Sequence, residues 1–234
     1  MVFEINEIIR FSQTDKDLLL KITEMLYFFQ DVATLQAEEL GVGLSVLEAR
    51  KMGWFLISWN IEIKRLPAYG EKVVVGTYPY QFRGMIGHRN CYLKTLDGEV
   101  LIKADSMWAL TDKEKGRMVS IPEDIRSEYE LGEPLSMTYL GRKIDVPDSA
   151  VAAEPIVIRP DHIDFHGHVN NAQYVQMVLG NVNKGAIRRL RVEYKKQTTL
   201  GEVLTPYIAV EGKTTTIALR TDEPHVVVQF ETES

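Results

Sequence analysis

The densest group of chemically active side chains in this sequence lies in the eleven residues from 161 to 171. This segment holds three of the chain's five histidines, together with two carboxylates and two amides: Asp161, His162, Asp164, His166, His168, Asn170 and Asn171. It directly precedes an expected helix, so backbone N–H groups and the positive end of the helix dipole face it. Such a place favours acyl chemistry, because a neutral imidazole takes a proton from water while N–H groups polarise a carbonyl.

Each polar residue of this segment has a functional and a structural interpretation. We expect His168 to act as a general base near pH 7 and Asp164 to orient it or share that duty. A zinc or iron site of His166, His168 and Asp164 is a weaker alternative, because no second ligand cluster accompanies them. Asn170 and Asn171 have the residue type of helix N-caps, and Asp161 with His162 is typical of a solvated turn.

An internal repeat organises the chain. Residues 61–71 read IEIKRLPAYGE and residues 192–202 read VEYKKQTTLGE, so that Glu62 of the first segment corresponds to Glu193 of the second. Both segments alternate apolar and polar residues as half-buried strands do, and a Gly-Glu pair then turns the chain. The repeat indicates a duplication and therefore two tandem domains.

A helical pattern precedes each repeated strand. In the first half, apolar residues recur at spacings of three and four from Leu18 to Ala33, which predicts one long buried helix with Thr14 or Asp15 capping an early turn. In the second half, Asn170 or Asn171 is expected to cap a helix from about Ala172 to Leu179 that ends at Gly180.

Strand-like runs follow each helix. They cover residues 73–80, 88–95, 100–110, 204–210, 215–220 and 226–231, and Asp97-Gly98 is a hairpin signal. One helix plus a mostly antiparallel sheet in each half defines an α+β fold. We expect an N-terminal domain over residues 1–132, a linker over 133–155 and a C-terminal domain over 156–234.

Composition restricts the classes of function. The formal net charge of −6 gives no overall electrostatic reason to bind nucleic acid. Cys91 is the only cysteine, which excludes an intrachain disulfide and a cysteine-based metal site and fits a reducing cytoplasm. The N-terminus has no secretory pattern, and no apolar run is long enough for a membrane helix. We therefore expect a cytoplasmic protein without membrane or nucleic-acid partners.

The segment Ile163–Asn171, with Tyr174 three residues on, resembles the D-x-N-x-H-V-N-N-x-x-Y signature of acyl-(acyl carrier protein) thioesterases. The strand Val192–Lys196 is similar to the family's apolar-Glu-Tyr followed by two basic residues. Further landmarks lie in the first half: Phe29-Gln30-Asp31-Val32-Ala33, Gly53-Trp54, Ile61-Glu62-Ile63, Pro67, Gly70-Glu71 and Ser106-Met107-Trp108. The resemblance implies a tandem double hotdog fold, in which each domain wraps an antiparallel sheet around one long helix.

The resemblance also implies an activity, namely hydrolysis of fatty acyl thioesters in fatty acid biosynthesis. Asp164 and His168 correspond to catalytic residues, and His166 stands where plant members carry Asn. Gln197-Thr198 stands where plant members have Glu-Cys, so no thiol nucleophile is available there. We expect direct attack by a water that His168 and Asp164 activate, with Gln197 positioning the water and backbone N–H groups and His166 holding the carbonyl. No metal or other cofactor is expected.

The acyl chain needs an apolar slot, and we expect Met25, Phe28 and Trp54 of the first half near it, with Asn170 and Asn171 as further substrate contacts. A helical aromatic stripe is also typical of an ordinary core. The first half would then shape the acyl pocket and the second half would hold the catalytic groups.

An acidic acyl carrier protein, the partner that the resemblance implies, would need a basic docking surface. Candidates occur in both halves: Arg188, Arg189, Arg191, Lys195, Lys196, Lys64, Arg65, Arg83 and Arg89. An acyl-CoA thioesterase and a non-catalytic module that binds acyl thioesters remain alternatives, and a homodimer is possible.

Overall fold

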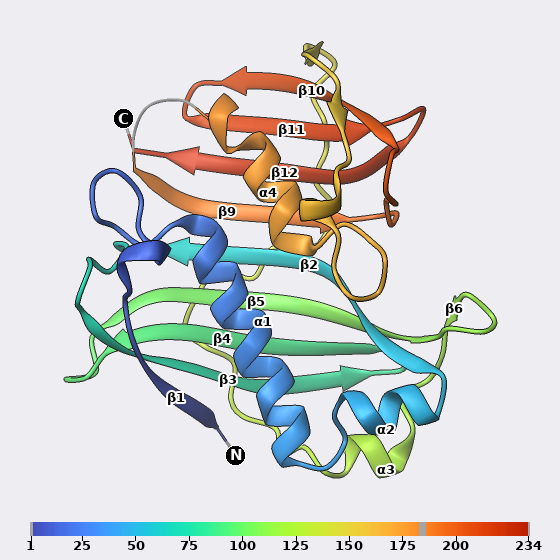
Figure 1. The fold of residues 1–234 in the computed structure, drawn as a ribbon. Coiled ribbons are helices and arrows are strands. Elements are labelled where there is room, and N and C mark those ends of the chain that lie inside the picture. The colour runs from blue at the N-terminus through green and yellow to red at the C-terminus, as the bar shows by residue number, and fades with distance from the viewer. Residues whose placement is uncertain (1, 183–185, 234) are drawn as a thin grey trace. The chain divides into compact units, whose positions relative to one another are not determined.

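The structure is a computed structural model that describes residues 2–182 and 186–233. The chain divides into two compact units. One consists of Met1–Ile57 with Glu62–Tyr139, and the other of Ser58–Ile61 with Leu140–Ser234. In each unit, one helix lies across an antiparallel sheet (Figure 1).

The first unit is built on strands in the order β1-β3-β4-β5-β2, with α1 packed on β3 (Figure 1). The elements are β1 (Phe3–Ile8), α1 (Ile22–Glu39), α2 (Leu44–Ala49), β2 (Met52–Ile63), β3 (Lys72–Arg83), β4 (Ile86–Thr95), β5 (Val100–Asp112), β6 (Arg117–Met118) and α3 (Glu123–Arg126). β6 pairs antiparallel with the end of β5, and the hairpin at Asp97-Gly98 joins β4 to β5 as predicted.

Helix α1 buries the apolar stripe that predicted it, including Met25, Leu26 and Phe29, each 0% exposed. Burying each such side chain contributes about 1.5–3 kcal/mol. The predicted start at Leu18 is wrong, because the helix begins at Ile22. Leu18 lies in a loop, 46% exposed and in the left-handed region at φ 59°.

The second unit has strands in the order β9-β12-β11-β10-β7, with α4 packed on β12 (Figure 1). The elements are β7 (Val151–Ala152), β8 (Ile156–Val157), α4 (Asn171–Val178), β9 (Ile187–Tyr194), β10 (Val203–Glu211), β11 (Thr214–Arg220) and β12 (Pro224–Thr232). The 3-10 turns Phe11–Gln13, Pro160–His162 and Leu179–Asn181 flank the helices. The predicted strands are confirmed, and α4 agrees with its prediction to within one residue.

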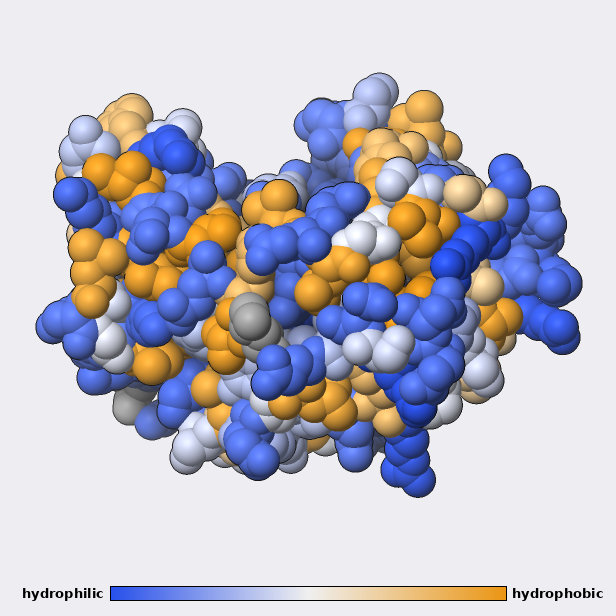
Figure 2. Space-filling view, turned by 90° about the horizontal axis from the view of Figure 1, so that it is seen from below, coloured by the Kyte–Doolittle hydropathy of each residue, from blue (hydrophilic) through white to orange (hydrophobic). Residues whose placement is uncertain are grey.

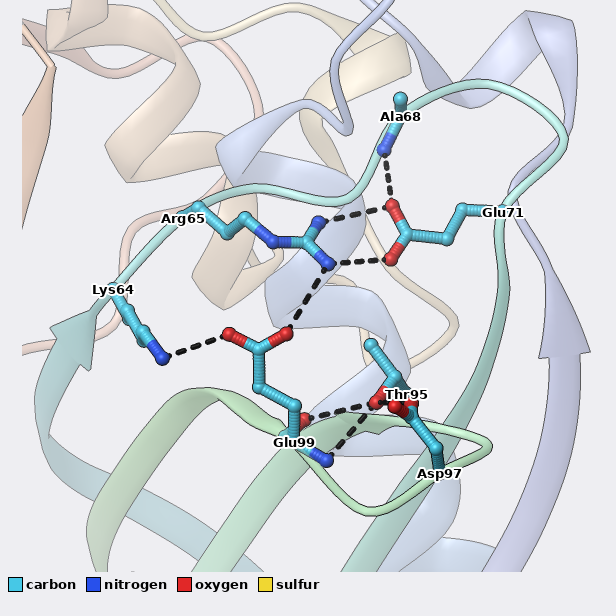
Figure 3. A network of polar contacts seen from close by, with 7 residues as sticks. All are labelled: Lys64, Arg65, Ala68, Glu71, Thr95, Asp97 and Glu99. Carbon is cyan, nitrogen blue, oxygen red and sulfur yellow. Dashed lines mark hydrogen bonds and ion pairs between the residues drawn. The ribbon is translucent and has the colours of Figure 1, made fainter.

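The two Gly-Glu turns of the repeat have the same local structure. Gly70 and Gly201 are left-handed, at φ 78° and 82°. The Glu71 carboxylate accepts the N–H of Ala68 and pairs with the Arg65 guanidinium, as Figure 3 shows. The Glu202 carboxylate accepts the N–H of Thr199 in the same way. Equivalent contacts at the two matched Gly-Glu pairs support the duplication that the repeat predicts.

The surface has the mixed character of a globular protein. On the face shown in Figure 2, hydrophobic residues lie in separate patches bordered by hydrophilic ones. Within the part of the chain that the structure describes, no helix is both long enough and apolar enough to cross a membrane.

Candidate active site

The loop that precedes α4 is closed by its own backbone. Ile163 and Val169 form an isolated antiparallel bridge. The N–H of Asp164 donates to the carbonyl of His168 (2.8 Å), and the N–H of Gly167 donates to the carbonyl of Asp164 (3.0 Å). Gly167 takes the left-handed conformation at φ 80°, which glycine adopts without strain. The loop therefore presents its side chains from a defined backbone.

The Asp164 side chain organises this loop. Its Oδ1 accepts the N–H of His166 (2.9 Å) and, at a longer distance of 3.4 Å, the N–H of His168. The structure thus brings Asp164 and His168 together, with the carboxylate bonded to the histidine backbone. Among the described residues, Oδ2 of Asp164 has no hydrogen-bond partner, so it can contact a bound molecule.

The His168 side chain is half-buried, and its Nδ1 is buried without a hydrogen-bond partner in the described part of the chain. A buried polar atom without a partner costs about 1–3 kcal/mol, so it calls for an explanation, and a catalytic role is one. His166 is exposed, and its ring lies against that of Phe165, with centroids 3.7 Å apart and the ring planes tilted by 38°. Phe165 is 72% exposed, so these two rings form the outer rim of the loop.

Asn170 and Asn171 form the start of α4. Oδ1 of Asn170 accepts the N–H of Ala172 (2.9 Å), so Asn170 is the N-cap. The carbonyl of Asn171 accepts the hydroxyl of Tyr194 (3.0 Å). The N–H of Asn171 has no acceptor among the described residues. It is therefore a backbone donor that can bind a carbonyl oxygen beside the histidine loop.

Beside this loop lies a buried chain of hydrogen bonds that sequence reasoning missed. The Tyr174 hydroxyl donates to Thr198 Oγ1 (2.9 Å), and Thr198 Oγ1 lies 2.7 Å from His225 Nδ1. His225 Nε2 lies 3.1 Å from Thr221 Oγ1. Because Thr198 Oγ1 accepts from Tyr174, its own proton is available to His225 Nδ1, and Nε2–H then donates to Thr221.

Burial controls the ionisation of this chain. It lowers the pKa of His225, with nearby Lys196 acting in the same direction, and it raises the pKa of Tyr174 to about 12. Both groups are therefore neutral near pH 7. The only sequence signal was the position of Thr198, where the plant pattern has Cys. Gln197, its neighbour, is exposed and makes no hydrogen bond among the described residues.

The residues expected to line an acyl pocket lie in the first unit. Met25 and Phe28 are buried on α1, 0% and 6% exposed. Trp54 is half-buried and packs against a hydrophobic cluster that consists of Ala37, Val42, Leu47, Leu110, Ile125 and Tyr129. All three are core positions in this structure, and their role toward an acyl chain stays a prediction.

Most of the basic residues proposed for docking have partners in their own unit. Arg188 and Arg189 pair with Glu233 and Glu231, and Lys195 pairs with Glu193. Arg191 donates to the carbonyls of Gly141 and Lys143. In the first unit, Lys64 pairs with Glu99, and Arg65 pairs with Glu71.

The proposal of Arg89 as a docking residue is wrong. Arg89 is 8% exposed and donates to Gln36 and Thr77, with its guanidinium 5.6 Å from the centre of the Tyr129 ring. It points inward because it shares a face of β4 with Cys91, which is 0% exposed. Lys196 and Arg83 are exposed.

Metal and thiol chemistry have little support here. The described residues contain no group of three or more His, Cys, Asp or Glu side chains that could hold a metal ion. Burial raises the pKa of the Cys91 thiol to about 11, with a hydrogen bond to Thr77 as a smaller opposing effect. Cys91 is therefore a poor nucleophile near pH 7.

Two helix-and-sheet units in one chain define the class of the protein, the tandem double hotdog fold, and solved structures share it. An acyl-ACP thioesterase from Bacteroides thetaiotaomicron matches with a TM-score of 0.90 and 20% identity, over 99% of this chain and 98% of that chain. A 12:0-ACP thioesterase from Umbellularia californica matches with a TM-score of 0.86 and 19% identity, over 99% and 97%. The predicted fold class is confirmed.

Family models identify the chain more closely. The Acyl-ACP thioesterase N-terminal domain matches residues 1–129, and the Acyl-ACP thioesterase C-terminal domain matches residues 147–230. The chain belongs to the acyl-ACP thioesterase family, which confirms the resemblance seen in the sequence.

Two curated plant proteins are similar to this chain. A chloroplastic palmitoyl-acyl carrier protein thioesterase of Arabidopsis thaliana is 25% identical over 91% of this chain and 56% of its own length. A chloroplastic dodecanoyl-[acyl-carrier-protein] hydrolase of Cinnamomum camphora is 24% identical over 91% and 60%. The chain thus spans little more than half the length of these relatives.

Proposed function

We propose that this protein hydrolyses fatty acyl thioesters of acyl carrier protein and releases free fatty acid. The observation that carries the proposal is the half-buried imidazole of His168, whose Nδ1 has no partner among the described residues, beside the N-terminal end of α4. Because Nδ1 is itself buried, the nitrogen that can exchange a proton with a reacting water is Nε2, which makes no hydrogen bond among the described residues. Membership of the acyl-ACP thioesterase family supports the same reaction.

In the proposed reaction, the oxygen of a water attacks the thioester carbonyl carbon while the His168 imidazole takes one of its protons. The carbonyl oxygen becomes an oxyanion, which the N–H of Asn171 and the positive end of the α4 dipole stabilise. His166 is a further donor toward this oxygen. The C–S bond then breaks, and the imidazolium returns its proton to the leaving thiolate, so the products are a carboxylic acid and the free thiol of the carrier.

Asp164 has two tasks in this proposal. Oδ1 holds the backbone of His166 and His168, so the loop keeps its geometry. The negative charge of the carboxylate favours the imidazolium that forms at His168 during attack. Gln197 is proposed to orient water from the exposed side of the site.

The proposal that the acyl group is carried by acyl carrier protein rests on the names of the similar plant proteins. The Arabidopsis and Cinnamomum proteins are named as acting on acyl carrier protein thioesters. We propose that the acyl chain contacts Met25, Phe28 and Trp54 and that residues 1–132 and 156–234 form the two domains, joined by residues 133–155. Exposed Lys196 and Arg83 are the basic side chains that we assign to the acidic carrier.

The test is release of free thiol from acyl carrier protein and CoA thioesters of matched chain length. The proposal predicts faster release from the carrier thioester. Equal rates would contradict carrier specificity, and faster release from CoA would assign the protein to the acyl-CoA thioesterases. Tight binding of acyl thioesters without release from either would identify a binding module and overturn hydrolysis.

A further inference from the structure

The two units repeat one loop in front of their helices. In the first unit, the N–H of Asp15 donates to the carbonyl of Leu19 (2.8 Å), and the N–H of Leu18 donates to the carbonyl of Asp15 (3.1 Å). Oδ1 of Asp15 accepts the N–H groups of Asp17 (2.9 Å) and Leu19 (3.0 Å). These are the bonds of the second unit's loop, with Asp15 in the place of Asp164.

The equivalence extends beyond the loop. The N–H of Leu20 donates to the carbonyl of Pro67, as the N–H of Val169 donates to the carbonyl of Thr198, each at 2.9 Å. The N–H of Lys64 donates to Leu101, as the N–H of Lys195 donates to His225, each again at 2.9 Å. Thr198 therefore occupies the position of Pro67, and His225 that of Leu101.

Three of these positions differ in polarity between the units. Met25 corresponds to Tyr174, since each is the fourth residue of its helix. The buried chain of Tyr174, Thr198 and His225 is therefore replaced in the first unit by Met25, Pro67 and Leu101. All are buried: Met25 and Leu101 are 0% exposed, as are Thr198 and His225, and Tyr174 is 3% exposed. The catalytic position differs in the same sense, because Leu19 stands where the second unit has His168.

Side chains that both units share serve the fold, whereas polar side chains found only in the second unit are candidates to serve His168. An Asp at the loop start is shared by both units, so the turn that it forms belongs to the architecture. Apolar side chains satisfy the other three positions in the first unit, so the fold does not need polar groups there. Buried polar groups destabilise a core unless each is hydrogen-bonded. At these three matched positions they occur only in the unit that contains His168.

We infer that Tyr174, Thr198 and His225 form a positioning unit for His168. This inference rests on the proposed function. Tyr174 and His225 bond to the Thr198 hydroxyl from either side and fix that residue. The carbonyl of Thr198 holds the N–H of Val169, the residue after His168. The hydrogen-bonded chain therefore sets the backbone from which the imidazole projects, without contacting the substrate.

The experiment compares wild type with the triple variant Tyr174→Phe, Thr198→Val, His225→Leu, which removes these three members together. It leaves unpaired only the hydroxyl of Thr221, an exposed residue to which water can bond. We expect it to fold, with a melting temperature within a few degrees of wild type. Its kcat for the carrier thioester should fall by about tenfold to a hundredfold at nearly unchanged KM, because the loss is one of alignment. A triple variant that does not fold would overturn the inference, since the chain would then be needed for architecture.

Two single variants supply controls. Thr198→Ser keeps the hydroxyl and should keep most of the kcat. Thr215→Val makes the Thr-to-Val change at another buried position of the second unit, where Oγ1 has no hydrogen-bond partner in the described part of the chain, and should leave kcat unchanged. Wild-type kcat in the triple variant, or a loss in Thr198→Ser as large as in the triple variant, would overturn the positioning role.

Histidine ring NMR signals supply a readout that does not depend on turnover. The His168 signals, assigned with a His168→Ala sample, should shift and broaden in the triple variant and remain in place in Thr215→Val. Unchanged His168 signals in the triple variant would contradict the inference. A wild-type protein that releases no thiol would instead contradict the proposed function, so the two failures are distinguishable.

Discussion

Asp15 and Asp164 make the same hydrogen bonds in two loops, one in each unit of the chain. Each carboxylate oxygen Oδ1 accepts backbone N–H groups two and four residues further along the chain. Only the loop of Asp164 carries histidines, with His166 and His168 at the positions where the loop of Asp15 carries Asp17 and Leu19. The structural and the catalytic tasks of Asp164 are therefore separable by comparison with Asp15.

Substituting both residues by Asn tests that separation. An Asn side chain keeps the oxygen that accepts the N–H groups, so both Asp15→Asn and Asp164→Asn should change the free energy of unfolding by less than about 1 kcal/mol. Asp164→Asn removes the charge beside His168, so its kcat should fall by about 10². Asp15→Asn should keep the wild-type kcat. Thiol release and urea unfolding on both variants give the answer, and equal kcat values would restrict Asp164 to a structural task.

Capping of α4 leads to a second prediction. Asn170→Ala removes the oxygen that accepts the N–H of Ala172, so the free energy of unfolding should fall by about 1 kcal/mol. Lys21 is the N-cap position of α1 and makes no side-chain cap, so Lys21→Ala is the matched control and should change stability by less than about 0.5 kcal/mol. Equal losses in the two variants, measured by urea unfolding, would contradict the capping role.

A buried carboxyl in the first unit predicts a pH dependence of stability. Burial raises the pKa of Asp105 to about 6 from the ordinary 3.8, although the Tyr80 hydroxyl opposes this by donating to its Oδ1 (2.8 Å). The folded protein therefore holds this proton more tightly than the unfolded chain. The contribution to stability is fully present below about pH 4 and is lost as the pH rises to about 6, at a cost of about 3 kcal/mol.

The variant Asp105→Asn isolates this contribution. Its stability relative to wild type should improve by about 3 kcal/mol between pH 4 and pH 8, measured by urea unfolding at both values. Asp97→Asn is the control of opposite sign, because the Thr95 hydroxyl lowers the pKa of the exposed Asp97 carboxyl. That variant should become less stable relative to wild type as the pH rises through values below about 4, and its relative stability should change little between pH 4 and pH 8. A constant difference for Asp105→Asn would show that the carboxyl ionises normally.

Local patterns predicted much of the fold. The Gly-Glu pair of the repeat is recognisable because it has a structural task in both units. Glu71 and Glu202 each accept a backbone N–H of a turn, and the glycine before each is left-handed. The strand segments either alternated apolar and polar residues or were continuously apolar, as the burial of one or both of their faces requires. The predicted start of α1 at Leu18 was wrong. The helical spacing of apolar residues continues through Leu18 and Leu19, but the turn formed by Asp15 keeps both residues out of the helix.

The candidate site was predictable only where it is contiguous in the sequence. Asp164 and His168 lie in one loop, so their association was visible from spacing. His225 lies far beyond Thr198 in the chain, and it reaches Thr198 because β12 pairs with β9 from Val226 and Tyr194 onward. No local pattern encodes that pairing. The hydrogen bonds of Thr198 reveal its association with His225. Its role is indicated by the first unit, where apolar residues occupy the equivalent buried positions.

The most direct test of the account is thiol release from an acyl carrier protein thioester by His168→Ala, compared with wild type under saturating substrate. The kcat of this variant should fall by about 10² or more, because the general base is lost. The melting temperature should change little, because the His168 side chain is only half-buried and makes no hydrogen bond within the described residues. A variant that folds and keeps a rate near that of wild type would contradict the assignment of His168 as the general base.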